Sequence, residues 1–264
     1  MTEQAHVGAP VLEAENLSIQ FGGLKALQEL SFSIPEKTVF SIIGPNGAGK
    51  TTFFNIVTGI YRPTGGDVRL YGESIVGLEP SRIVERGICR TFQNIRLFQN
   101  LTVLENVMIG RQLHERTGRG DILLRTQRFR AQEAETLDRA AEILDYVGIL
   151  DDANALAKNL PYGRQRRLEI ARALATAPRL LLLDEPTAGM NPSESEEMVQ
   201  LFQRICEERG ICVLMIEHDM KVVMGVSQRI LVLNFGRQIA LGSPREVLEN
   251  EEVITAYLGH QKVM

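Results

Sequence analysis

A glycine-rich stretch carries the clearest chemistry in this sequence: Gly44-Pro45-Asn46-Gly47-Ala48-Gly49-Lys50-Thr51-Thr52. It matches G-x-x-x-x-G-K-[ST], the pattern of a loop that binds phosphate through backbone N–H groups and the positive end of a helix dipole. Lys50 is expected to reach the terminal phosphates of a nucleotide, and the Thr51 hydroxyl is expected to ligate Mg²⁺. The alternative is an ordinary glycine-rich turn beside a surface lysine.

The loop stands in the strand–loop–helix context that this chemistry requires. Residues 38–43, before it, form an apolar run rich in β-branched side chains and predict a buried strand. Residues 53–57, after it, predict a helix. The sequence therefore favours a phosphate-binding loop over a plain turn.

Two later apolar runs end in residues that could act on a phosphate. Residues 180–183 are all leucine and run directly into Asp184 and Glu185. Residues 211–216 predict another buried strand, which ends at Glu217-His218-Asp219. Parallel strands covered on both faces read as continuous apolar runs, and open α/β sheets bind ligands at the carboxyl ends of such strands. We therefore expect Asp184 and Glu185 at a ligand-binding edge.

The remaining periodicities predict an α/β fold with an inserted helical part. We take residues 1–10 as a flexible tail and 11–264 as one domain, with an α/β core at 11–100 and 178–264 and an inserted helical subdomain at about 101–177. Strands are predicted at 11–21, 30–34, 68–71 and 88–92, with a hairpin at 230–233 and 237–241. Helices are predicted at 80–87, 131–147, 163–175, 193–208 (capped by Ser193), 244–248 and 251–258. The arginine-rich residues 111–130 are either a solvated loop or a contact surface for a partner.

Composition excludes several classes of protein. The 264 residues are 44% hydrophobic, and the formal net charge of −4 provides no electrostatic footprint for nucleic acid. The cysteines, Cys89, Cys206 and Cys212, show no paired spacing and suit a reducing compartment. No apolar run of about 18 residues and no secretory leader is present, so we expect the chain to stay in the cytoplasm.

Several motifs occur together in one order and spacing, namely Phe21, residues 44–52, Gln93, residues 160–165, Asp184-Glu185 and His218. In this order they resemble the ATP-binding subunits of ABC transporters, over almost the whole chain. The resemblance implies the ABC ATPase fold: a P-loop NTPase core with a mixed sheet, an antiparallel β subdomain and an inserted α-helical subdomain. It also implies ATP hydrolysis coupled to transmembrane transport, with ATP and Mg²⁺ as cofactors.

The resemblance assigns a role to each matching residue. Phe21 matches the aromatic that stacks on adenine, although a strand-end core aromatic is the alternative. Asp184 matches the acid that holds Mg²⁺ through water, and Glu185 the carboxylate that orients or deprotonates the attacking water. Gln93 matches a glutamine that senses the metal where the helical subdomain meets a transmembrane partner. His218 matches a histidine that contacts the γ-phosphate, whereas a lone histidine after a strand is usually structural.

Residues 160–165, Leu-Pro-Tyr-Gly-Arg-Gln, stand where the family has its L-S-G-G-Q signature. In the family this helix start faces the ATP bound by a second subunit, so Tyr162, Gly163 and Arg164 are implied in ATP binding across a head-to-tail dimer. Pro161 removes a hydroxyl and an N–H group, whereas Arg164 could supply a compensating charge. We therefore expect somewhat weaker ATP-driven dimer closure. Asn191 stands where an aspartate is commoner.

Three stretches, residues 90–98, the signature with 166–172, and 253–259, resemble most closely the hydrophobic amino-acid importer branch. This implies branched-chain amino-acid uptake and a peripheral place on the cytoplasmic face of the inner membrane. The implied partners are permease subunits, a second ATPase of the same or a related chain, and indirectly a solute-binding protein, but no nucleic acid. The alternatives for transport are urea or amide import and lipopolysaccharide export. The alternatives outside transport are a soluble ABC ATPase of DNA repair or translation and an ATP-binding scaffold without turnover.

Overall fold

The computed structural model describes residues 10–114 and 126–258. The predicted tail at 1–10 therefore lies outside the described residues except for Pro10, and so does the middle of the arginine-rich segment. The chain forms two compact units: the first combines the stretch up to Arg90 with the stretch from Arg179 onwards, and the second is Thr91–Pro178.

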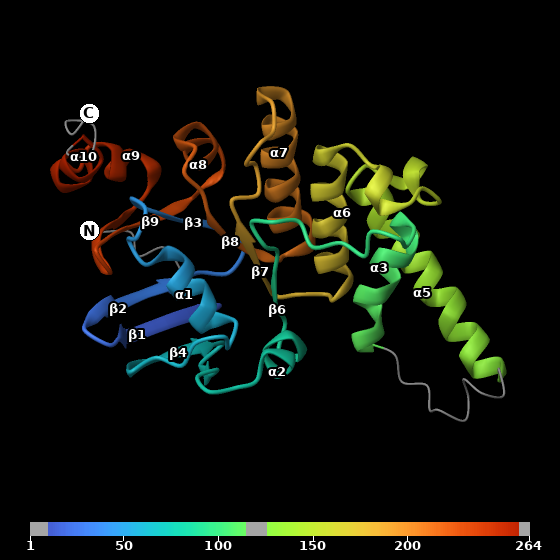
Figure 1. Ribbon diagram of the computed structural model, residues 1–264, viewed down its shortest axis with the longest axis horizontal. Coiled ribbons are helices and arrows are strands. Elements are labelled where there is room, and N and C mark those ends of the chain that lie inside the picture. Colours follow the sequence, from blue (N-terminus) through green and yellow to red (C-terminus); the bar gives the residue numbers. More distant parts are fainter. Residues whose placement is uncertain (1–9, 115–125, 259–264) are drawn as a thin grey trace, which may run out of the picture. The chain divides into compact units, whose positions relative to one another are not determined.

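A six-stranded mixed sheet dominates the first unit (Figure 1), in the order β10-β9-β3-β8-β7-β6. All its pairings are parallel except that of β9 with β10. Every residue of β3, β7 and β8 is buried, which explains why their sequences are continuous apolar runs and confirms these predicted strands. The strands are β3 Val39–Ile43, β6 Ile88–Arg90, β7 Leu180–Asp184, β8 Cys212–Ile216, β9 Arg229–Asn234 and β10 Arg237–Gly242.

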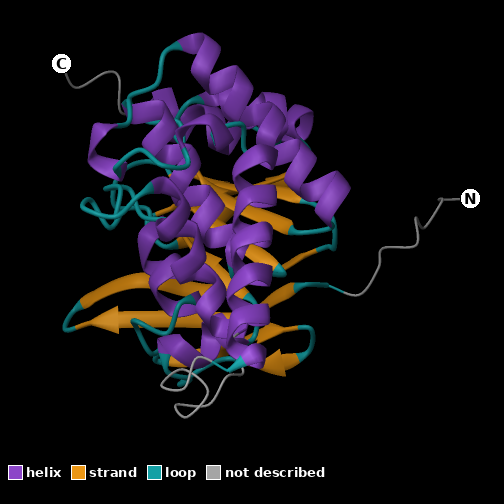
Figure 2. Ribbon diagram, turned by 90° about the vertical axis from the view of Figure 1, so that its right-hand side faces the viewer, coloured by secondary structure: helices purple, strands orange, loops and turns teal. Residues whose placement is uncertain are grey.

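A second, antiparallel sheet of the same unit has the order β2-β1-β4-β5, and Figure 2 shows the strands in two groups. Its strands are β1 Leu12–Phe21, β2 Leu24–Ile34, β4 Gly65–Leu70 and β5 Glu73–Ser74. The strand predicted at 30–34 was too short, because β2 begins at Leu24. Glu29 has a positive φ of 49°, and the register with β1 shifts beside it. Such a bulge interrupts the alternation on which the prediction depended.

The helices of the first unit are α1 Lys50–Val57, α2 Pro80–Glu85, α7 Pro192–Arg209, α8 Met220–Val226, α9 Pro244–Leu248 and α10 Glu251–Leu258. Helix α1 begins at Lys50 rather than at residue 53, because its first turn is polar and shows no apolar period. Ser193 was wrongly predicted as the cap of α7. The cap is Asn191, whose side chain accepts a hydrogen bond from Glu194 N while Glu194 accepts one from Asn191 N, each at 3.0 Å.

Three smaller differences from the predictions concern short elements. Strand β6 ends at Arg90, although the prediction continued it to residue 92. Strand β5 and helix α8 were not predicted, because each is too short for a clear period.

Three aromatic rings in contact tie the phosphate-loop elements to the core. The ring of Phe32 on β2 lies 5.6 Å from that of Phe40 on β3 and 5.3 Å from that of Phe53 on α1, measured between centroids. All three side chains are buried. The strand before the loop and the helix after it are therefore anchored by the same cluster.

The second unit is helical, with α3 Val103–Arg111, α5 Gln127–Tyr146 and α6 Tyr162–Ala175. Helix α5 begins before the predicted residue 131 because Thr126 caps it by accepting from Phe129 N at 3.3 Å. A Cβ atom added at Gly110 of α3 would lie 2.4 Å from the Arg172 carbonyl oxygen of α6. Only glycine permits this close approach of the two helices.

Candidate active site

The glycine-rich loop leads from the end of β3 into α1, and its glycines are required by space and by conformation. Gly44 has a φ of 150° and Gly49 a φ of 103°. An added Cβ would lie 2.1 Å from the Leu233 carbonyl oxygen at Gly44, and 2.6 Å from that of Ala26 at Gly49. Gly49 is also the N-cap of α1, and no side chain caps the helix there. The first-turn N–H groups therefore have no side-chain cap competing with an anion.

The turn between β9 and β10 supports this loop through backbone hydrogen bonds. Gly236 N donates to the Ala48 carbonyl at 3.0 Å, and Gln28 N donates to the Gly236 carbonyl at 2.8 Å. The Gln28 side chain also donates to the Phe235 carbonyl at 2.9 Å. The loop is thus held between β2 and the last hairpin of the sheet.

The Lys50 ammonium group lies folded over the loop. Its Nζ donates to the carbonyl oxygens of Gly44 at 2.6 Å and Pro45 at 3.0 Å. Burial lowers the pKa of Lys50, and the negative charges of Glu185 and Asp184 act in the opposite direction. Lysine and both acids therefore belong to one electrostatic site.

Asp184 ends β7 and forms a buried ion pair that the sequence did not predict. Its Oδ2 accepts from the Arg90 guanidinium at 2.8 Å, and the side chains are only 9% and 6% exposed. Arg90 also donates to Asn55 Oδ1 on α1 at 2.7 Å and lies over the Phe54 ring at 5.3 Å. The carboxylate is therefore oriented from the neighbouring strand β6.

Glu185 and His218 follow β7 and β8 and lie beside each other. The Glu185 backbone has a positive φ of 47°, and its N donates to the Ile216 carbonyl at 2.9 Å. His218 Nδ1 lies 3.8 Å from Glu185 Oε1. The histidine side chain is 66% exposed, whereas that of Glu185 is 24% exposed. The imidazole is therefore accessible to a ligand, unlike a core histidine.

Glu217 is a further residue whose role the sequence reasoning missed. It is buried, and its Oε1 accepts from both the N–H of Thr187 at 3.0 Å and the Thr187 hydroxyl at 2.6 Å. Its Oε2 accepts from the His218 N–H at 3.1 Å. Glu217 thus joins the turn after Glu185 to the backbone of His218. The only signal in the sequence was an acid at the end of an apolar run.

Phe21 ends β1 just before the Gly22-Gly23 turn. It is 43% exposed, so it is not a core aromatic. Its ring meets that of Tyr61 edge-on, with centroids 5.2 Å apart. An exposed ring of this kind can stack on a base, and that role stays a prediction.

The other predicted site residues lie in the second unit. Tyr162 replaces a signature glycine, and its Oη accepts from Arg166 on the same helix at 3.2 Å. The Arg164 guanidinium donates to Asp152, and this contact raises the pKa of Arg164. Part of the charge that Arg164 could offer a phosphate is therefore already paired. The Gln93 carbonyl accepts from Arg166 at 2.8 Å.

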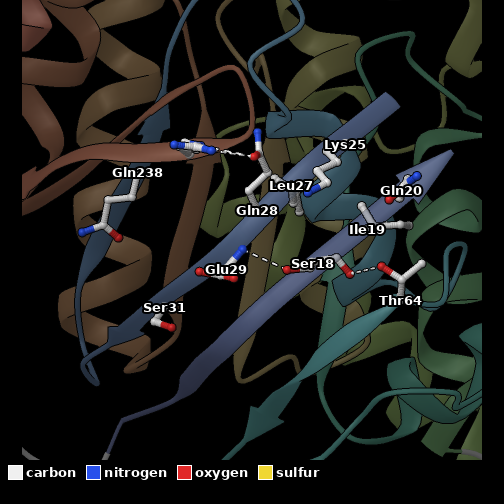
Figure 3. A pocket seen from close by; sticks show the side chains of 11 residues that line it. Ser18, Ile19, Gln20, Lys25, Leu27, Gln28, Glu29, Ser31, Thr64 and Gln238 are labelled. Carbon is white, nitrogen blue, oxygen red and sulfur yellow. Dashed lines mark hydrogen bonds between the residues drawn. The ribbon is translucent and has the colours of Figure 1, made fainter. Parts of the chain in front are cut away.

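An open groove of about 670 Å³ lies over the antiparallel sheet beside β10 (Figure 3). Glu29 N donates to Ser18 Oγ at 2.9 Å and Arg237 donates to Gln28 Oε1 at 3.0 Å within it. None of its lining residues is among those predicted to bind ATP, so it is not the predicted nucleotide site.

None of the helices in the described ranges has the length and apolar character needed to span a bilayer.

A family model described as "ABC transporter" matches residues 27–188, more than half of the chain. This chain belongs to the ABC transporter family. A second model, described as "Branched-chain amino acid ATP-binding cassette transporter", matches residues 237–263. Membership of the family, as the motifs predicted, is therefore confirmed.

Relatives of this ABC protein match it along nearly its whole length. The high-affinity branched-chain amino acid transport ATP-binding proteins LivG of Salmonella typhimurium and BraF of Pseudomonas aeruginosa are each 47% identical over 250 residues, covering 95% of this chain and 98% of theirs. The lipopolysaccharide export system ATP-binding protein LptB of Haemophilus influenzae is 33% identical over 251 residues, covering 95% of this chain and 98% of its own.

Solved structures confirm the predicted ABC ATPase fold. The crystal structure of the ADP conformation of MJ1267, an ATP-binding cassette of an ABC transporter, matches with a TM-score of 0.83 and 31% identity, covering 96% of this chain and all of that one. A dimeric, post-hydrolysis structure of the cassette MJ0796 bound to ADP and Pi matches with a TM-score of 0.74 and 28% identity, covering 89% and 99%. The chain is thus a nucleotide-binding ABC ATPase coupled to transport.

Proposed function

We propose that this chain is the ATP-hydrolysing subunit of an importer for branched-chain or other hydrophobic amino acids. The observation that carries the substrate class is the match of residues 237–263 to the branched-chain amino acid cassette family, together with 47% identity to LivG and BraF. An ATPase subunit does not touch the solute, so this assignment is an association. Lipopolysaccharide export is the second candidate. It is supported by the 33% identity to LptB, which is lower than the 47% identity to LivG and BraF.

The partners follow from the same proposal. The subunit docks on transmembrane permease subunits at the cytoplasmic face of the inner membrane. It pairs head-to-tail with a second ABC ATPase, the same or a related chain, and a solute-binding protein delivers the amino acid. The dimeric MJ0796 structure supports the pairing.

In the proposed reaction, the chain's own residues mainly position and stabilise charge. Lys50 and the α1 N-terminus hold the terminal phosphates, and Phe21 stacks on the adenine. Glu185 orients or deprotonates the attacking water, and His218 beside it contacts the γ-phosphate. Gln93, in the segment after β6, completes the site in the same chain. The signature residues act on the ATP of the second subunit; they are Tyr162, Gly163 and Arg164.

The oxygen ligands present suit Mg²⁺, a hard cation that binds few protein groups besides phosphate oxygens. The Thr51 hydroxyl and the Asp184 carboxylate would hold it, with the Gln93 side chain as a further contact. When bound, Mg²⁺ neutralises negative charge on the phosphates. Asp184 is suited to this because Arg90 fixes its carboxylate by a 2.8 Å contact.

The test compares Glu185→Gln with Glu196→Gln, an exposed position on α7 that serves as the control. Glu185→Gln should bind ATP like the parent and lose nearly all turnover, whereas the control should hydrolyse at the parent rate. Turnover of Glu185→Gln at the parent rate would show that Glu185 is not the base.

The same variant tests the partners, and the parent complex tests the solute. Tagged Glu185→Gln with ATP and Mg²⁺ should co-purify two polytopic permease subunits and a second ATPase from detergent-solubilised membranes. The parent complex in proteoliposomes should import labelled leucine. Transport of urea or movement of lipopolysaccharide would disprove the substrate class, and recovery of soluble or nucleic-acid-bound proteins alone would disprove the transporter function.

A further inference from the structure

The loop that carries Gln93 is held by side chains rather than by secondary structure. The described residues between β6 and α3 form no helix or strand, so their backbone polar groups need other partners. Arg166 donates through Nη1 to the Phe92 carbonyl at 2.7 Å and through Nη2 to the Gln93 carbonyl at 2.8 Å. Glu169 Oε1 accepts from the N–H groups of Phe92 and Arg96, each at 3.4 Å. Four backbone groups thus converge on one ion pair of α6.

This ion pair is almost completely withdrawn from solvent. Arg166 Nη1 lies 2.8 Å from Glu169 Oε2, and the side chains are 0% and 1% exposed. A guanidinium presents its donors in a rigid planar fork, so two consecutive carbonyls bound to its two ends are fixed in direction as well as in distance. Tyr162 Oη accepts from the same guanidinium, which connects the fork to the first turn of α6.

The far end of the loop has its own anchor on α3. Asn106 is fully buried, and its side-chain oxygen accepts from Phe98 N at 2.9 Å while its Nδ2 donates to the Phe98 carbonyl at 3.1 Å. The segment from Phe92 to Phe98 is therefore attached at both ends to helices of the second unit. It has the contacts of a part of that unit rather than of a free connection.

We infer that Arg166 and Glu169 are positioning residues that make the Gln93 loop and the signature end of α6 move as one body. A displacement of the signature helix then carries the Gln93 backbone with it, because the carbonyls of Phe92 and Gln93 are bonded to that helix. The inference deepens the proposed function and rests on the roles proposed there for Gln93 and the signature.

The test variant is Glu169→Gln in the full chain, with Glu142→Gln as the matched control. Glu142 pairs with Arg139 at the same i,i+3 spacing on α5, but the two side chains are 60% and 56% exposed. A glutamine cannot accept from Arg166 and from the two loop N–H groups at once. Hydrogen–deuterium exchange of residues 92–98 should become about ten- to a hundredfold faster, the range for losing hydrogen bonds to a charged group. Exchange of residues 44–52 should not change.

Kinetics of the complex with its permease distinguish positioning from a merely structural role. The kcat of Glu169→Gln should fall about ten- to a hundredfold through misplacement of Gln93. Its KM for ATP should stay at the parent value, because Lys50 and its loop are untouched. The control should match the parent in both exchange and kinetics.

A double variant, Arg166→Met/Glu169→Leu, is used if Glu169→Gln does not fold, since apolar replacement of a buried ion pair is often tolerated. Unchanged exchange at residues 92–98 in a folded variant, equally faster exchange throughout the chain, or an unchanged kcat would each overturn the inference. Absence of ATP hydrolysis in the parent would refute the proposed function instead, and the exchange result would still decide whether the pair holds the loop.

Discussion

The Arg90–Asp184 ion pair allows a prediction of stability. Arg90→Met keeps an apolar stem over Phe54 but removes the guanidinium from Asp184 and Asn55. The paired side chains are 6% and 9% exposed, so solvent screens the contact little. Removing one partner of a buried pair leaves a buried charge uncompensated and costs about 3–5 kcal/mol. We expect Arg90→Met to lose roughly this much free energy of unfolding.

Thermal unfolding of the nucleotide-free protein measures this loss. For a chain of this size, about 1 kcal/mol lowers the midpoint by about 2 °C, so the expected shift is about 6–10 °C. Arg82→Met is the control: Arg82 pairs with Glu85 on α2, where the side chains are 69% and 50% exposed. The control should change the stability by no more than about 0.5 kcal/mol.

A double variant identifies the cause of the loss. Arg90→Met/Asp184→Asn removes both charges and should recover much of the lost stability, because no unpaired carboxylate remains. If the double variant is no more stable than Arg90→Met, the uncompensated charge is not the cause. A single variant as stable as the parent would refute the importance of the pair altogether.

Two further predictions concern the cap of α7 and the phosphate-loop lysine. Asn191→Ala should lower the free energy of unfolding by about 1 kcal/mol in urea titrations, whereas Ser193→Ala should change it by less than about 0.5 kcal/mol; a larger effect at Ser193 would contradict the cap assignment. Burial lowers the pKa of Lys50 in the folded protein below its ordinary 10.5. At a pH between the folded pKa and 10.5, the unfolded chain therefore binds more protons than the folded chain. In that pH range, the free energy of unfolding should rise with pH, while the affinity for a fluorescent ATP analogue should fall. Lys50→Arg should remove both trends. An unchanged pH dependence in Lys50→Arg would exclude Lys50 as the titrating group.

The parts of the fold that the sequence predicted are those that depend on local pattern. Every residue of strands β3, β7 and β8 is buried, so their sequences are uninterrupted apolar runs that can be recognised without the structure. The phosphate loop was predictable because its glycines are imposed by backbone geometry at Gly44 and Gly49. Strand β2 and the start of α1 were misjudged, because a bulge and a polar first turn hide the period.

The parts that the sequence did not predict are pairings between distant residues. Arg90 and Asp184 meet only because β6 and β7 are neighbours in the sheet. Arg166 and Glu169 are close in sequence, but nothing local says that their partners are the carbonyls and N–H groups of residues 92–96. Such contacts depend on the tertiary structure, and a polar residue within an apolar pattern is the only local signal of them.

The place of β3 in its sheet has a consequence for synthesis on the ribosome. Its two neighbours are β8 and β9, so the strand before the phosphate loop has no partner until Cys212 and the residues after it are made. At about 5–20 residues per second, those roughly 170 residues take on the order of ten to thirty seconds. During that time an apolar strand edge is exposed on the nascent chain, and a chaperone that binds extended apolar segments would meet it there. The nascent chain therefore cannot assemble its nucleotide site until the residues of β8 and β9 have been made.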